Sequence, residues 1–317
     1  MGLMKIEKKL VVPFLMATVV LLAGSTHTLL GHNFSSDESA SFLALVNTIK
    51  AEAQLVQQNI ANNNMSLASE HANKALTLMT DNVNKEIAER NQRLSDDLNT
   101  DLASLKTSTE SVSSNNTASD TELLVDDIDG ILDEIVTARI DPDQLNNSTI
   151  QVLAAVELLD GVLRNYGDAF AVGYDMTNMS LMTMVGNNNN STNSDSGNSI
   201  SMHSMSTMNM GRGSVGNNKS IEDMSDSDDK LVNITDYQTA RALAMKVQEL
   251  FDNQIMNSSL AEGSETVDQS INNVSTALKE LVTNIDRKSS PVDIMTIVHT
   301  RIHPNLMTVF GLQLEND

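Results

Sequence analysis

The 317-residue chain contains no cysteine and no tryptophan, and only three tyrosines, six phenylalanines and four prolines. The lack of cysteine excludes disulfides, thiolate metal sites, cysteine nucleophiles and lipid anchors on cysteine. Because aromatic residues are scarce, a core must be built mainly from Leu, Ile, Val, Ala and Met, which favours helices over an aromatic-rich β-sandwich. Basic residues are also few, with 20 Lys and Arg against 42 Asp and Glu. The formal net charge of -22 makes nucleic acid a poor candidate partner.

The first 34 residues have the pattern of an export signal. Lys5, Lys8 and Lys9 precede an uncharged, mostly apolar run from Leu10 to Gly24. This run is shorter than the ~20 residues of a membrane span, so we predict a signal peptide, with an uncleaved N-terminal membrane anchor as the alternative. Both interpretations place the rest of the chain outside the cytoplasm, as a secreted, periplasm-like or cell-surface protein.

Twelve Asn-x-Ser/Thr sequons agree with an exported glycoprotein. Chance occurrence in a chain rich in Asn and Ser is the alternative, because the motif is short. Most sequons fall between helical stretches, where a glycan is tolerated. The asparagines are Asn33, Asn64, Asn115, Asn146, Asn147, Asn178, Asn189, Asn190, Asn218, Asn233, Asn257 and Asn273.

Apolar residues recur with helical spacing over most of the chain. From Phe42 to Ile60 they step by 4, 3, 4, 3 and 4 positions, and a similar stripe runs from Leu124 to Ile135. There is no βαβ alternation, so we predict an all-α helical bundle interrupted by one long insertion. The expected parts are the N-terminal signal or anchor (1–34), a helical region (35–174) with a flexible linker near 107–120, a low-complexity insertion (175–230), and C-terminal helices (231–317) that pack on the same bundle.

The insertion contains a duplicated methionine pattern. Eight of the 18 methionines follow the spacing MxxMxxMxM twice, with steps of 3, 3 and 2, and a histidine lies within the second copy. A thioether is a soft, neutral donor without a proton, which suits Cu(I) better than hard cations. The predicted ligands are Met176, Met179, Met182 and Met184 in the first copy, and Met202, His203, Met205, Met208 and Met210 in the second.

This spacing resembles the methionine motifs of extracytoplasmic copper proteins, which implies a ligand chemistry and no particular fold. The alternative is a low-complexity linker in which methionine is incidental or packs on a partner surface. A packed core is not expected from a segment with so few other apolar residues.

Three longer stretches carry a second resemblance. NMSLASEHANKAL, RNYGDAFAVGYDMTNMS and VHTRIHPNLMTVFGLQL are similar to segments of exported proteins of ammonia-oxidising archaea. The resemblance covers nearly the whole chain after the signal. It implies an extracytoplasmic setting in copper-dependent cells and no particular activity.

His299 and His303 form a second candidate metal site, because residues four apart project from one helix face. Met295 and Met307 extend the same ladder. Pro304 is expected to end or kink the helix at His303. Ordinary surface or capping histidines are the alternative. His71 could join them only if its helix packs against theirs, and a hydrogen-bonded, half-buried histidine is the competing expectation.

Other motifs do not support catalysis. Gly211–Gly216 matches GxGxxG, but no strand precedes it, and no P-loop or nucleophile motif occurs. We therefore predict a non-enzymatic, copper-binding exported protein. The alternatives are a cell-surface interaction or spacer protein with a glycosylated disordered loop, and a bundle that binds iron or copper through histidines.

Overall fold

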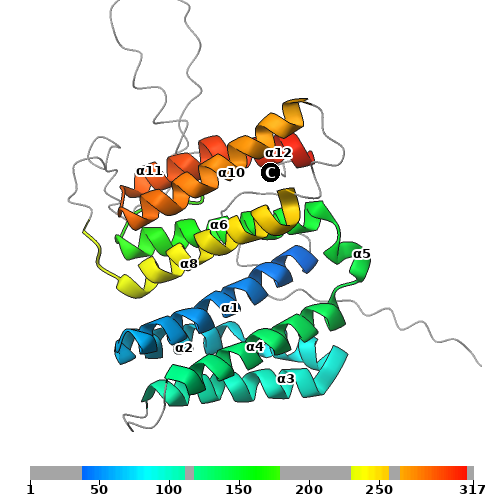
Figure 1. Cartoon of the computed structure of the whole chain (residues 1–317), viewed down its shortest axis with the longest axis vertical. Coiled ribbons are helices and arrows are strands. Elements are labelled where there is room, and N and C mark those ends of the chain that lie inside the picture. The colour runs from blue at the N-terminus through cyan, green and yellow to red at the C-terminus, as the bar shows by residue number, and fades with distance from the viewer. Residues whose placement is uncertain (1–37, 111–117, 179–229, 257–264, 313–317) are drawn as a thin grey trace, which may run out of the picture.

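The computed structural model describes residues 38–110, 118–178, 230–256 and 265–312. Within these ranges the regular structure is helical and no strand occurs, which confirms the predicted all-α class. The helices lie in stacked layers, and the N-terminal and C-terminal helices occupy opposite ends of the stack (Figure 1). No helix in the described ranges is long and apolar enough to cross a bilayer.

The N-terminal helices form one end of the stack around α1. α1 packs on α2, α4, α6 and α8, and α3 completes this end against α2 and α4. The bounds are α1 Glu38–Ala61, α2 Met65–Leu78, α3 Asp81–Glu110, α4 Ala118–Arg139, the short α5 Pro142–Leu145, and α6 Ser148–Ala169.

The C-terminal helices cover the opposite face of α6. α8 lies beside α6, and α10 packs on α8 and on the last helices (Figure 1). The bounds are α8 Ile234–Leu250, continued by a π-helical turn η3 Phe251–Ile255, then α10 Glu265–Asp286, α11 Pro291–Thr296, the π-helical turn η5 Ile297–Ile302, and α12 His303–Phe310.

Small residues allow α6 and α8 to approach closely. A Cβ atom at Gly161 would lie 2.9 Å from Leu243 Cδ1, so only glycine fits there without a shift of the leucine. Tyr166, also on α6, is fully buried, and its hydroxyl donates to the carbonyl oxygen of Ser289 at 2.6 Å. One of the few aromatic residues of the core thus connects α6 to the residue that precedes the cap of α11.

The linker predicted near 107–120 is helical at both ends. α3 continues to Glu110 and α4 begins at Ala118, and residues 111–117 lie outside the described ranges. Thr107 and Ser108 are helical, and their hydroxyls donate to carbonyl oxygens of their own helix. Thr109 is buried, which gives this polar end of α3 a packed side.

Polar side chains cap two of the C-terminal helices. Ser290 caps α11, with Pro291 at the first helical position. Thr235 and Gln238 have the spacing of a capping box, but the cap of α8 is Asn233, whose Oδ1 accepts from the N–H groups of Thr235 and Asp236. An asparagine two residues before Thr235 thus takes the capping role.

Candidate functional site

The C-terminal histidine pair lies in the interior of the bundle. His299 is 3% exposed and His303 is 0% exposed, and their ring centroids are 5.6 Å apart. The alternative of surface histidines is therefore wrong. The two rings share one side of the chain, as the four-residue spacing predicted.

Pro304 does not end the helical path at His303. His303 has φ -58° and ψ -47°, and its N–H bonds to the carbonyl oxygen of Val298, five residues back. Because proline has no N–H, the regular ladder is interrupted here, and η5 absorbs the interruption as a π-helical turn. The change from η5 to α12 falls at His303, the residue at which the sequence predicted an end or a kink.

His299 holds the beginning of the methionine-rich segment. Its Nε2 donates to the carbonyl oxygen of Met176 at 2.8 Å. The Met176 side chain is 2% exposed, and its sulfur would lie 3.2 Å from a Cβ placed at Gly167 on α6. The expectation that this segment adds nothing to a core is wrong for Met176, because the glycine leaves room for the thioether.

The other predicted ligands of the insertion lie outside the described residues. They are Met179, Met182, Met184, Met202, His203, Met205, Met208 and Met210. The chain rejoins the bundle beside the point where it left, because the N–H groups of Val232 and Asn233 both donate to the carbonyl oxygen of Ala169. α6 and α8 thus present the two ends of the insertion close together.

Of the two methionines that extend the spacing of the histidine pair, only one is fully buried. Met295 is buried and Met307 is half-buried. Among the described residues, no group of three or more His, Asp or Glu side chains is arranged to hold a metal ion. The pair alone therefore does not form a complete carboxylate–histidine centre.

His71 does not join the other two histidines. It lies on α2, and Figure 1 shows that α6 and α8 lie between α2 and the helices α11 and α12. His71 is fully buried, and Glu52 Oε2 lies 2.6 Å from its Nδ1, while Gln238 Oε1 lies 2.8 Å from its Nε2. A three-histidine centre is thus not formed, and the expected hydrogen-bonded histidine is found with deeper burial than predicted.

The contacts of His71 belong to a polar cluster that joins α1, α2, α6 and α8. Lys74 Nζ donates to Asp236 Oδ1 at 2.6 Å, to Thr239 Oγ1 at 3.0 Å and to Asn165 Oδ1 at 3.2 Å. Thr239 in turn donates to Glu52 Oε1 at 2.9 Å. Sequence reasoning missed Glu52, although its place three residues after Ile49 and four before Val56 puts a charge within the apolar stripe of α1.

Several carboxyl groups have raised pKa values because the bundle removes them from water. Burial is the largest cause in each case, and neighbouring carboxylates add to it at Asp101, from Asp127 and Asp97. A hydrogen bond from Ser41 opposes the rise of the Glu157 pKa. The pKa values of Asp129 and Asp168 are raised in the same way.

We expect mild acid to stabilise the bundle. A carboxyl with a raised folded pKa holds a proton that the unfolded chain has already lost, so its stabilising contribution is complete below the unfolded value of about 4 and disappears as the pH rises through the folded pKa. The melting temperature, followed by circular dichroism, should therefore be higher at pH 5 than at pH 7.

Asp129→Asn isolates one of these groups. This variant should melt at a higher temperature than wild type at pH 7, with a smaller difference at pH 5. Asp133→Asn serves as the control, since Asp133 accepts from Lys50 Nζ at 2.7 Å and its neutralisation removes an ion pair. Equal melting temperatures of wild type at the two pH values would contradict the expectation.

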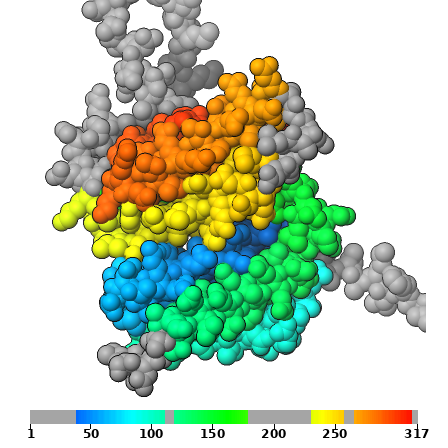
Figure 2. All heavy atoms as spheres, viewed as in Figure 1, coloured from blue at the N-terminus to red at the C-terminus, as the bar shows by residue number. Residues whose placement is uncertain are grey.

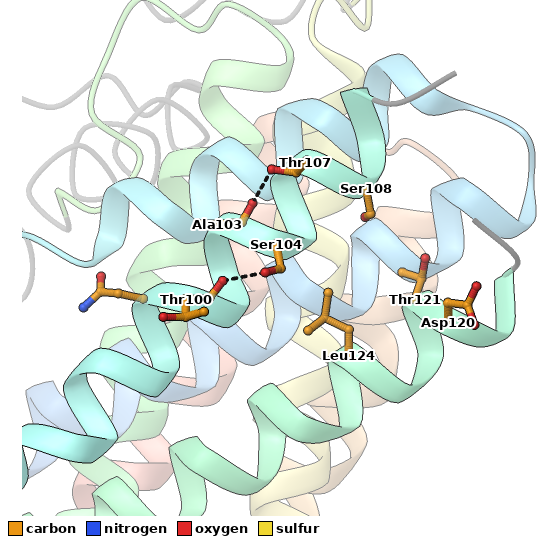
Figure 3. A pocket seen from close by; sticks show the side chains of 9 residues that line it. Thr100, Ala103, Ser104, Thr107, Ser108, Asp120, Thr121 and Leu124 are labelled. Carbon is orange, nitrogen blue, oxygen red and sulfur yellow. Dashed lines mark hydrogen bonds between the residues drawn. The ribbon is translucent and has the colours of Figure 1, made fainter. Parts of the chain in front are cut away.

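A cavity of about 720 Å³ lies between α3 and α4, beside the ends that flank residues 111–117. Figure 3 shows that short polar side chains line it, and Ser104 and Thr107 donate to carbonyl oxygens of their own helix. Among the described residues that line it, Asp120 is the only ionisable one, so these residues provide no cluster of groups for catalysis or metal binding.

A longer groove follows α1. Its first part, about 740 Å³, lies between α1 and α8, where Figure 2 shows a hollow, and its second part, about 410 Å³, lies between α1 and α4. Charges along it pair with one another, as Lys50 does with Asp133 and Lys246 does with Glu249 at 3.1 Å. The groove therefore concentrates no charge of one sign.

No protein-family model, curated protein or solved structure matches this chain.

Proposed function

We propose that this protein is an exported, non-enzymatic metal-binding protein that captures or buffers copper, as Cu(I), through its methionine-rich insertion. The observation that carries the proposal is the recurrence of MxxMxxMxM at Met176–Met184 and Met202–Met210. Short steps between thioethers allow three or four sulfurs to surround one soft ion, so each copy holds about one ion. His203 adds an imidazole to the second copy.

The bundle supports this proposal as a platform for the insertion. Met176 is held by His299, and the chain returns at Ala169, so both ends of the segment are attached to one region of α6. The net charge of -22 adds a general attraction for cations. The predicted export signal places the site outside the cytoplasm, where it would meet copper before membrane enzymes do.

A Cu(I) titration against a chromogenic chelator tests the proposal. Wild type should withdraw about two Cu(I) ions per chain from the chelator, one for each copy of the pattern. A variant in which the clustered methionines are changed to serine should lose this capacity. Met176 is kept, because it is a core residue. The seven changes are at Met179, Met182, Met184, Met202, Met205, Met208 and Met210.

The control changes Met65 and Met245, two exposed bundle methionines, to serine. It should bind copper as wild type does. If the seven-methionine variant withdraws as much Cu(I) as wild type, the proposal fails.

A second candidate is a cell-surface interaction or spacer protein with a glycosylated loop. Asn64 and Asn147 favour it, because both sequon asparagines are exposed and cap helices through Oδ1, whereas a glycan is attached through Nδ2. Protein purified without metal from metal-supplemented medium, with glycans on these two residues, would support this candidate over copper binding.

A further inference from the structure

His71 has a hydrogen-bond acceptor at each ring nitrogen. Glu52 Oε2 lies 2.6 Å from Nδ1, and Gln238 Oε1 lies 2.8 Å from Nε2. Because His71 is 0% exposed and Glu52 is 1% exposed, the solvent does not supply a replacement partner. A neutral imidazole carries a single N–H and can serve only one of these two acceptors as a donor.

The orientation of the Gln238 amide is fixed by a neighbour. Asn59 Nδ2 donates to the carbonyl oxygen of Leu55 at 2.8 Å, and a carbonyl can only accept, so the Asn59 amide has one possible orientation. Asn59 then exchanges hydrogen bonds with Gln238, donating from Nδ2 to Oε1 at 3.0 Å and accepting at Oδ1 from Nε2 at 3.3 Å. Gln238 must therefore present Oε1 to His71, and His71 Nε2 must carry a hydrogen.

The Glu52 side of the ring favours a carboxylate. Thr239 Oγ1 accepts from the Lys74 ammonium, and its own hydrogen has two acceptors within reach, of which Glu52 Oε1 at 2.9 Å is nearer than the carbonyl oxygen of Thr235 at 3.1 Å. Hydrogen bonds donated to a carboxylate favour its ionised form. With Glu52 ionised, both oxygens accept, and His71 Nδ1 must also carry a hydrogen.

Neither neutral tautomer of His71 satisfies both neighbours when Glu52 is ionised. With hydrogen on Nε2 alone, the Nδ1 lone pair would face the carboxylate, and with hydrogen on Nδ1 alone, the Nε2 lone pair would face Gln238 Oε1. Two acceptor atoms that face each other without a hydrogen between them lower the stability of a buried site. The arrangement therefore requires one proton more than a neutral histidine and an ionised glutamate carry together.

We propose that the Glu52–His71–Gln238 chain is a pH-sensitive latch, which fastens α2 to α1 and α8 only while the His71–Glu52 pair keeps this additional proton. The charged groups around the pair are Glu70 and Lys74 on α2, Asp236 on α8, and Asp168 on α6, which interacts electrostatically with Lys74 and Asp236. Lys74 is paired with Asp236, and Glu70 accepts from the Thr235 hydroxyl, so each of these three already has a partner.

The sign of the pH dependence follows from proton counting. A histidine released into water is mostly neutral above about pH 6.5, so the open form binds one proton fewer than the closed form in that range. Stability of the closed latch therefore falls as the pH rises. Loss of a single linked proton changes the opening equilibrium by about tenfold per pH unit.

Two measurements on wild type test the latch. Nitrogen-15 NMR of the His71 ring at about pH 7 should show both nitrogens protonated. Hydrogen exchange of the α2 amides, corrected for the intrinsic pH dependence of exchange, should lose about tenfold protection per pH unit on the alkaline side. A neutral ring in an otherwise folded protein overturns the proposal, and so does protection of α2 that is constant over this range.

The Glu52→Gln variant separates the latch from general alkaline destabilisation. A glutamine amide at residue 52 can donate to Nδ1 and still accept from Thr239, so the neutral Nε2–H tautomer satisfies every partner. Its α2 protection should therefore no longer depend on pH. Glu70→Gln is the matched control, because it removes a carboxylate from the same cluster without touching the ring, and it should keep the wild-type slope. Equal slopes in Glu52→Gln and wild type overturn the proposal.

Discussion

Replacing residues 179–229 with a flexible linker should abolish tight Cu(I) binding while the bundle still folds. The replaced stretch contains every predicted thioether ligand except Met176. A linker of about twelve Gly and Ser residues reaches up to about 40 Å, so it imposes little strain on the ends of the segment. Copper binding is measured by the chelator titration, and folding by far-ultraviolet circular dichroism.

The physical reason for an intact bundle is the attachment of both ends of the insertion. Ala169 accepts from Val232 and Asn233, and Asn233 caps α8 itself, so α6 and α8 need no residue of 179–229 to find each other. The melting temperature should stay within a few degrees of wild type. Retention of tight Cu(I) binding by the shortened protein would contradict the expectation and move the site to the bundle.

Glu52→Ala should destabilise the bundle by about 3 kcal/mol near pH 7. The substitution leaves His71 without its acid partner in a site that excludes water, and removing one member of a buried ion pair costs about 3–5 kcal/mol. Thr239 loses an acceptor at the same time. Urea denaturation followed by circular dichroism measures the change in the free energy of unfolding.

Glu134→Ala provides the comparison for Glu52→Ala. Glu134 accepts from Arg93 at 2.7 Å, and both side chains are 60% exposed, where an ion pair contributes little to stability. Both variants replace a glutamate with alanine, so a difference between their losses of unfolding free energy reports the effect of burying the ion pair. Equal losses of stability at the two positions would show that the His71–Glu52 pair contributes no more than a surface contact.

The apolar spacing was sufficient to predict helices such as α1 and α4, whereas α6, in the middle of the bundle, is buried on most of its faces. The period from Phe42 to Ile60 corresponds to α1, and Ser290 with Pro291 marks the start of α11. Local polarity was a weaker guide. Thr107 and Ser108 resemble linker residues by composition, yet they stay helical because the end of α3 packs against α4.

The candidate sites were predictable in part. The four-residue spacing of His299 and His303 predicted that their rings would be neighbours, but not their burial, which depends on how α11 and α12 pack on α6 and α10. The partners of His71 come from residues 19 and 167 positions away. Contacts of that range are set by packing between helices, so a single sequence does not reveal them.

Tyrosine fluorescence can follow the folding of one half of this protein. There is no tryptophan, and two of the three tyrosines, Tyr166 and Tyr237, have ring centroids 6.5 Å apart. Their hydroxyls donate to carbonyl oxygens of Ser289 and Ile285, at the boundary between the middle helices and the C-terminal ones. Tyrosine fluorescence therefore reports whether α10 and α11 are docked, whereas far-ultraviolet circular dichroism reports every helix. Separate transitions by the two probes would show that the α2–α4 end melts independently of the tyrosine-bearing end.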